Sequence, residues 1–149
     1  MNQLSKKQAK QFSALIKSLA KGQLPWKVAI LIDSTIEHRS SLHADNVKRF
    51  NHGKGFQIGH QWTNVVLIIN DKLIPLPPIP FYNKSYCRQH NLKYQTENAL
   101  VVEYIDQLNL QDYIGAHQSK RVVVLADSGY DDRKIQKAII KKNGILLLP

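Results

Sequence analysis

Two aspartates, Asp33 and Asp127, have the sequence surroundings that most clearly suggest chemistry in this chain. Asp33 follows the apolar run Val28–Ile32. Asp127 follows a second apolar run, Val122–Ala126. Each run is typical of a β-strand buried on both faces. An ionisable residue just past the end of a buried parallel strand lies where open α/β sheets place their sites. We therefore expect two strands that each release a carboxylate at the carboxyl end.

Two carboxylates on neighbouring strands could bind divalent metal together. Such strands are about 4.8 Å apart, so Asp33 and Asp127 could share one ion or hold a pair. Mg²⁺ prefers oxygen ligands and keeps several waters, which leaves room for phosphate oxygens. A two-metal site activates the attacking oxygen and stabilises the leaving oxygen of an in-line displacement. The alternative is that both aspartates only cap helices or begin loops.

The remaining elements decide whether the two aspartates meet. Hydrophobic periodicity and turn signals predict a basic helix within 1–25, followed by three strands near 28–32, 65–69 and 72–78. A helix near 96–108, a strand at 122–126, a helix near 133–142 and a final strand at 145–148 should follow. The second and third strands should form a hairpin, and prolines should confine the third to an edge. The segments 37–55, 80–94 and 109–120 are expected to be irregular, turn-rich or, for the first, short-helical connections.

This order of elements is that of an α/β, ribonuclease H-like core, in which a mixed β-sheet is flanked by helices. In that arrangement the first and fourth strands lie side by side and run parallel. Asp33 and Asp127 would then emerge at the same edge of the sheet. We expect a basic N-terminal helix over residues 1–25 and a partial ribonuclease H-like domain over residues 26–149.

The chain of 149 residues is strongly basic, with a formal net charge of +10. Such an excess suggests a polyanionic partner, either nucleic acid or an anionic membrane surface. The candidate nucleic-acid contacts lie in predicted loops and in the last predicted helix: Lys54, Lys84, Arg88, Arg133, Lys134 and Lys137. Tyr82, Tyr86 and Tyr94 alternate with cations and could stack on bases. The same tyrosines could instead attach the loop to the core.

Composition argues against several other kinds of protein. His38, His43 and His52 are irregularly spaced without a supporting cysteine, so chance histidines in a basic loop are favoured over a metal site. No apolar run reaches the roughly 18 residues of a membrane-spanning helix, and the start of the sequence does not resemble a signal peptide. Cys87 is the single cysteine and cannot form an internal disulfide. These features predict a cytoplasmic protein.

The two aspartate motifs resemble those of a known enzyme family. Ile32-Asp33-Ser34-Thr35 is similar to the first-aspartate motif of DDE transposases, the insertion-sequence class often grouped as IS4-like. Residues 123–131, with Asp127 at their centre, are similar to the second-aspartate motif. The stretch from Val65 through Pro80-Phe81-Tyr82 also fits the region between the motifs. The resemblance implies a ribonuclease H-like core that nicks and joins DNA with Mg²⁺ or Mn²⁺. It also implies that Asp33 and Asp127 are the catalytic, metal-binding acids.

The chain departs from that family in one respect. The third acid of the family, a Glu on a helix, lies after the strand that is expected to end this chain, and nothing follows Pro149. Glu97 and Glu103 precede Asp127 and cannot take that place in order. The resemblance therefore implies a truncated and inactive transposase core, or one part of a split transposase, that lacks the third acid and is incomplete at its C-terminus. Its partners would be DNA and either a companion chain or a second copy.

Two other functions remain open from the sequence. A haloacid-dehalogenase-like phosphohydrolase also places an Asp at a strand end, but its nucleophile usually has an acid two residues later, where this chain has Thr35. A basic nucleic-acid-binding module without catalysis would use both aspartates only as caps. Such a module would bind DNA whether or not Mg²⁺ is present.

Overall fold

The computed structural model describes residues 28–41, 43–52, 55–70, 72–114, 122–142 and 144–148. The basic helix expected within residues 1–25 and the candidate contact Lys54 lie outside the described residues. Within these ranges, no helix has both the length and the apolar character needed to cross a membrane.

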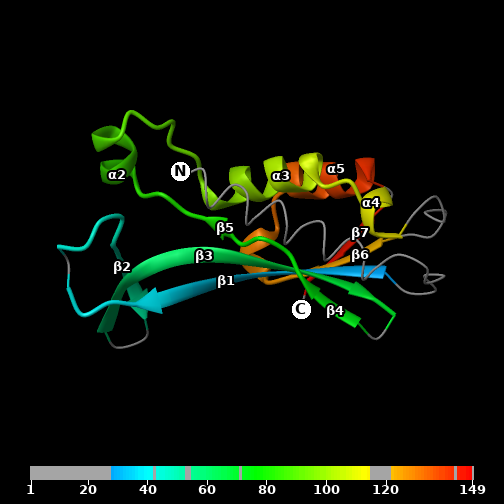
Figure 1. Ribbon diagram of the computed structural model, residues 1–149, viewed down its shortest axis with the longest axis horizontal. Helices are drawn as coiled ribbons and strands as arrows, with labels where there is room; N and C mark the ends of the chain where they lie inside the picture. The colour runs from blue at the N-terminus through cyan, green and yellow to red at the C-terminus, as the bar shows by residue number, and fades with distance from the viewer. Residues whose placement is uncertain are drawn as a thin grey trace.

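A seven-stranded mixed sheet is the centre of the described structure (Figure 1). Its strands are β1 (Val28–His38), β2 (Lys48–His52), β3 (Gly55–Ile69), β4 (Lys72–Pro75), β5 (Ile79–Pro80), β6 (Val122–Ala126) and β7 (Gly144–Leu147). The main order is β2-β3-β1-β6-β7, and β4 and β5 also pair with β3. β1 is antiparallel to β3 and parallel to β6. β1 is therefore the strand at which the antiparallel and parallel parts of the sheet join.

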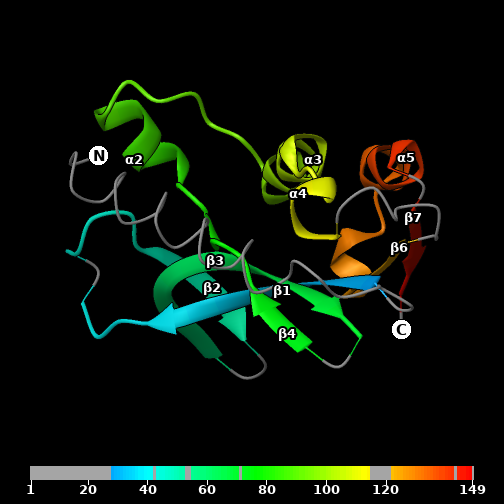
Figure 2. The same cartoon turned by 45° about the vertical axis from the view of Figure 1, so that its right-hand side comes forward.

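Helices cover one face of this sheet. They are α2 (Lys84–Gln89), α3 (Glu97–Gln107), α4 (Gln111–Ile114) and α5 (Arg133–Lys141), with a short 3₁₀ turn, η1 (Ser128–Tyr130), before α5. α3 and α5 lie side by side above the sheet (Figure 2). Val101 of α3 and Ile135 of α5 are almost completely buried in the core between the helices and the strands. This burial supplies the main driving force that holds the helices on the sheet.

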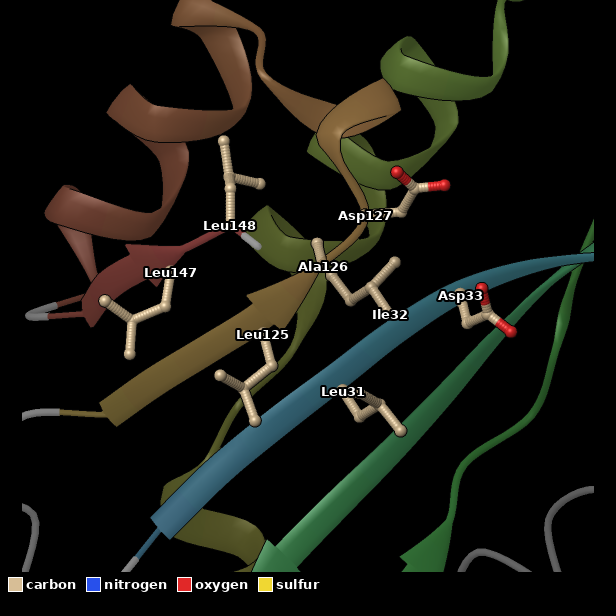
Figure 3. Close-up of a pocket in the computed structure, with 8 residues that line it drawn as sticks. All are labelled: Leu31, Ile32, Asp33, Leu125, Ala126, Asp127, Leu147 and Leu148. Atoms are coloured by element: carbon tan, nitrogen blue, oxygen red, sulfur yellow. The ribbon is translucent and has the colours of Figure 1, made fainter.

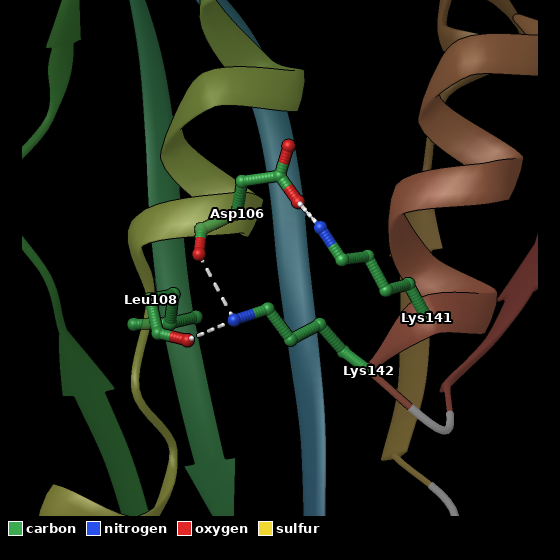
Figure 4. Close-up of polar contacts among 4 residues, drawn as sticks. All are labelled: Asp106, Leu108, Lys141 and Lys142. Atoms are coloured by element: carbon green, nitrogen blue, oxygen red, sulfur yellow. Dashed lines mark hydrogen bonds and ion pairs between the residues drawn. The ribbon is translucent and has the colours of Figure 1, made fainter.

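The C-terminal ends of α3 and α5 are joined by two lysines (Figure 4). The Lys142 ammonium donates hydrogen bonds to the main-chain oxygens of Asp106 and Leu108, at 2.9 and 3.2 Å. These carbonyls belong to the last turn of α3, where intrahelical partners run out and a cation is favourable. Lys141 adds an ion pair with the Asp106 carboxylate at 3.4 Å, which is exposed and therefore contributes little.

The expected fold class is confirmed: the chain forms an α/β mixed sheet flanked by helices, in the ribonuclease H-like order. The first and fourth predicted strands, β1 and β6, do lie side by side and parallel. The predicted hairpin is β3–β4. The Thr96 side chain caps α3 and the Asp132 side chain caps α5.

The prediction that the first strand ends at Ile32 is wrong. β1 continues to His38 because residues 33–38 pair with residues 59–64 of β3. Asp33 therefore lies in the middle of an 11-residue strand and not at its carboxyl end. The long partner strand supplies backbone hydrogen bonds to polar residues that, on side-chain character alone, resemble a loop.

The expectation that β1 and β6 are buried on both faces is also wrong. In β1, Leu31 is 39% exposed although Ile30 and Ile32 on either side are buried. In β6, Val123 and Leu125 are only half-buried. Successive strand residues point to opposite faces, so this alternation places the helices on one face and leaves the other face open in the described structure.

All three segments that were predicted as connections contain a short regular element. The segment 37–55 includes strand β2, because β3 begins already at Gly55 and offers it a pairing edge. The segment 80–94 includes α2, whose N-cap Asn83 accepts a hydrogen bond from the Tyr86 main-chain N–H. The segment 109–120 includes α4. β2 is a strand because it pairs with the start of β3, which follows it closely in the chain, and α2 begins at a single capping residue.

Gly59 provides a test of how closely β3 approaches β1. A Cβ atom at Gly59 would collide with the main-chain oxygen of Glu37, which cannot move without shifting β1. We predict that Gly59→Ala lowers the free energy of unfolding by about 1–3 kcal/mol, as overpacking does. Gly55→Ala is the control, because a Cβ there meets nothing within 4 Å. Urea denaturation that gives equal stabilities for the two variants would contradict the packing described for this strand pair.

Candidate functional site

Asp33 and Asp127 are each the next residue after the last pair, Ile32 and Ala126, in the parallel pairing of β1 with β6. The parallel register runs from Ala29 opposite Val123 to Ile32 opposite Ala126. Both aspartates line one open cavity of about 530 Å³. The other residues around it are Leu31, Ile32, Leu125, Ala126, Leu147 and Leu148 (Figure 3). The pairing of two strands thus brings together residues that are distant in the sequence.

The two aspartates reach this cavity from different local structures. Figure 3 shows Asp33 on the β1 ribbon and Asp127 where the chain leaves β6, with both carboxylates at the right of the view. Both side chains are exposed. Asp33 is next to buried Ile32 in a strand, so its side chain lies on the open face with that of Leu31.

Asp127 is held by its own turn. Its side chain caps η1: Oδ1 accepts a hydrogen bond from the Ser128 hydroxyl at 2.9 Å and one from the Gly129 main-chain N–H at 3.3 Å. These hydrogen bonds, the Ser128 one first, lower the pKa of Asp127 below its ordinary value. The alternative role considered for this residue, a cap, is therefore present in the structure. Capping uses one carboxylate oxygen, so it leaves the other oxygen for a ligand.

The donors at this edge suit a hard divalent cation. Among the described residues, the Asp33 carboxylate has no hydrogen-bond or ion-pair partner, so none of the described cations neutralises it. Two carboxylates give oxygen ligands of the kind that Mg²⁺ and Mn²⁺ take, with water or phosphate oxygens in the other positions. Within the described ranges, no group of three or more His, Cys, Asp or Glu side chains converges as a metal cage.

A polar cluster that the sequence patterns did not predict lies on the covered face near these acids. The Glu97 carboxylate accepts hydrogen bonds from the Thr63 hydroxyl at 2.9 Å and the Tyr130 hydroxyl at 2.7 Å. The Gln61 side-chain amide donates to the same carboxylate. Thr63 and Tyr130 are 2% and 3% exposed. The available signal was polar Gln61 and Thr63 at alternate positions of a strand, on the same face as buried Val65.

The candidate nucleic-acid contacts do not form one surface. Lys84 and Arg88 are exposed on α2. Arg133, Lys134 and Lys137 are exposed on α5. α2 and α5 lie toward opposite ends of the structure in both views (Figures 1 and 2). The basic side chains of α5 follow Asp127 closely along the chain, and those of α2 do not.

The aromatic residues beside α2 interact mainly with one another. The Tyr82 and Tyr86 rings stack with centroids 5.3 Å apart, and Tyr86 also packs on His90. The Lys84 ammonium lies 5.3 Å from the centre of the Tyr94 ring. Tyr82 remains partly exposed and Tyr86 half-buried, so one ring of the stack is accessible. These ring contacts therefore help to hold the segment around α2 in place. That role is close to the second one predicted for the tyrosines, which is to attach the loop to the core.

Comparisons with known proteins gave no family assignment. No protein-family model and no curated protein matches the chain. The chain is similar to a solved structure titled "Crystal structure of the Mos1 Strand Transfer Complex", with a TM-score of 0.38 and 14% identity over 99% of this chain and 42% of that one. A second, "Crystal structure of a pre-cleavage Mos1 transpososome", has a TM-score of 0.30 and 13% identity over 99% and 43%. The chain therefore spans less than half the length of either protein.

Ser128 provides a test of the electrostatics at Asp127. We predict that Ser128→Ala raises the pKa of Asp127 toward the ordinary value, because the alanine removes the hydrogen bond that contributes most to lowering it. The pKa of Asp132 is also lowered, chiefly by the Lys134 main-chain N–H, and it should not change. NMR titration of the side-chain carboxyl carbons measures both in one sample. A Ser128→Ala protein with an unchanged Asp127 pKa would show that the hydroxyl does not bind the carboxylate.

Proposed function

We propose that this chain is the catalytic core of a DDE-type DNA transposase of the IS4-like kind, which cleaves and joins phosphodiester bonds with Mg²⁺ or Mn²⁺. One observation carries the proposal: Asp33 on β1 and Asp127, directly after the parallel neighbouring strand β6, each follow the last paired residues and line a single open cavity. The aspartates are also the centres of the two short motifs that resemble this family.

In this proposal Asp33 and Asp127 bind the divalent metal, which would activate the attacking oxygen and stabilise the leaving one when bound. The protein contributes two carboxylates in fixed positions, one on a central strand and one in a capped turn. The described residues bring only two acids to this edge, so a third of the kind used by the family would come from elsewhere, such as a companion chain. The open cavity leaves one side of the acids free for a phosphate group.

DNA would approach this edge over the basic start of α5. Arg133 and Lys134 open the helix that follows η1, six and seven residues after Asp127. Lys137 continues the same exposed surface one turn later. Exposed cations of this kind neutralise backbone phosphates and do not select sequence. We assign the phosphate contacts nearest to the acids to these three residues, and a secondary role to Lys84 and Arg88.

A non-catalytic DNA-binding module is the second candidate, because Asp127 does cap η1. The phosphohydrolase alternative is not supported by a comparable observation. It requires its first Asp at a strand end, whereas β1 continues for five residues beyond Asp33. Metal binding therefore distinguishes the two remaining candidates.

We predict that the protein binds Mn²⁺ and that either Asp33→Asn or Asp127→Asn abolishes measurable binding. Asparagine caps a helix as well as aspartate does, so Asp127→Asn keeps the turn but removes the charge. Asp106→Asn is the matched control, since Asp106 is an exposed acid on α3 whose partner is Lys141. Isothermal calorimetry measures all four proteins. Equal Mn²⁺ binding by the wild type and both site variants would reject the proposed catalytic site and leave the DNA-binding module.

We also predict that replacing Arg133, Lys134 and Lys137 together by alanine weakens binding to duplex DNA and reduces its salt dependence. The slope of log K against log salt should fall by about 0.9 for each DNA phosphate that the variant no longer neutralises. The double variant Lys84→Ala and Arg88→Ala should have a smaller effect, because α2 lies toward the opposite end of the structure from α5, the helix that follows Asp127 (Figures 1 and 2). Fluorescence anisotropy over a salt series measures both. A greater weakening in the double variant would move the main DNA surface to α2.

A further inference from the structure

The Glu97 carboxylate contacts the turn that carries Asp127 directly, and it is linked to the strand that carries Asp33 through Gln61 of β3. On one side, it accepts a hydrogen bond from the Tyr130 hydroxyl, and Tyr130 ends the turn that Asp127 caps. On the other side, it accepts from the Gln61 amide, and the same amide nitrogen donates to the Ser34 hydroxyl at 3.1 Å. Ser34 directly follows Asp33. One side chain of α3 is therefore linked by short hydrogen-bond paths to the neighbours of both aspartates.

These bonds connect three different strands or turns. Thr63 and Gln61 lie in β3, Ser34 lies in β1, and Tyr130 lies in η1 after β6. Glu97 itself stands in the first turn of α3, where an acid is favoured by the helix dipole. Hydrogen bonds to an ionised carboxylate are roughly twice as strong as neutral ones. Burial, followed by the bond to Glu97, raises the pKa of Tyr130, so its hydroxyl remains a donor.

We propose that Glu97 is a positioning residue that fixes the turn bearing Asp127 relative to the strand bearing Asp33. The inference rests on the proposed function, in which the two acids bind one metal site. Glu97 does not line the cavity and would not touch the metal. It acts through Tyr130 on one side and through Gln61 and Ser34 on the other. This explains why an acid is found on the covered face of the sheet, where an apolar residue would otherwise be expected.

The hydrogen-bond directions require a carboxylate at this position. Thr63, Tyr130 and Gln61 all direct donors at Glu97. In Glu97→Gln, an NH₂ group replaces one of the two carboxylate oxygens. A donor of the new side chain then faces a donor of a neighbouring side chain. If the new oxygen keeps Thr63 and Tyr130, the new amide opposes the Gln61 amide. The double variant Gln61→Glu with Glu97→Gln restores one donor and one acceptor at that contact, so it should recover what the single variant loses.

The test combines Mn²⁺ calorimetry with amide hydrogen exchange of the Gly129 N–H, which is bonded to Asp127. We expect Glu97→Gln to weaken Mn²⁺ binding by about 10–100-fold, as loss of an outer-shell partner does. The Gly129 amide should exchange faster. Glu103→Gln is the matched control, because Glu103 is on the same helix, is exposed, and accepts from two glutamine amides. It should change neither quantity, and the swapped double variant should recover both.

The outcomes separate this inference from the proposed function. Mn²⁺ binding by the wild type with no change in Glu97→Gln would overturn the positioning role and leave the metal site intact. No Mn²⁺ binding by the wild type would reject the proposed function, and the Gly129 exchange rate alone would then decide whether Glu97 holds the turn. If Glu97→Gln does not fold, Tyr130→Phe keeps the ring and removes one donor. An unchanged Gly129 exchange rate and Mn²⁺ affinity in that variant would also overturn the inference.

Discussion

The parallel pairing of β1 with β6 is the interaction on which the rest of this structure depends. It joins the antiparallel part of the sheet to the strands that follow α3, and it sets the register in which Ile32 faces Ala126. A shift of one residue would move each side chain of a strand to the opposite face of the sheet. Buried Ile32 and Val124 would then meet solvent, so the apolar face that packs on α3 and α5 fixes the register. The positions of the two aspartates follow from that packing.

The carboxylates of Asp33 and Glu97 lie on opposite faces of the sheet and have different surroundings. On the open face, Asp33 has no partner among the described residues and faces a cavity. On the covered face, the Glu97 carboxylate accepts three hydrogen bonds from neighbouring side chains. The half-buried Glu97 side chain already accepts hydrogen bonds from three neighbours, and the exposed Asp33 side chain remains available to a ligand. The two kinds of carboxylate are thus suited to different roles, one structural and one chemical.

Much of this arrangement could be predicted because it depends on local patterns. The apolar run Val122–Ala126, the helix that begins after Thr96 and the cap at Asp132 are all recognisable within a few residues. The full length of β1 could not be predicted in this way. Its second half is polar and is a strand only because residues 59–64 of β3, which come later in the chain, provide hydrogen-bond partners. The open face was missed for a related reason, since strands covered on one face and on both faces can have equally apolar sequences.

The candidate site follows the same division. The two aspartates could be found from the sequence because each follows an apolar run, but the Glu97 cluster could not, since its members come from four separate elements. The central claim is that Asp33 and Asp127 bind one divalent metal site. A crystal structure of the protein soaked in Mn²⁺, with anomalous scattering used to locate the metal, tests it most directly. If the two acids share one metal site, an anomalous peak should lie within about 2.2 Å of an oxygen from each aspartate. A peak bound elsewhere, or no peak between the two carboxylates, would contradict the claim.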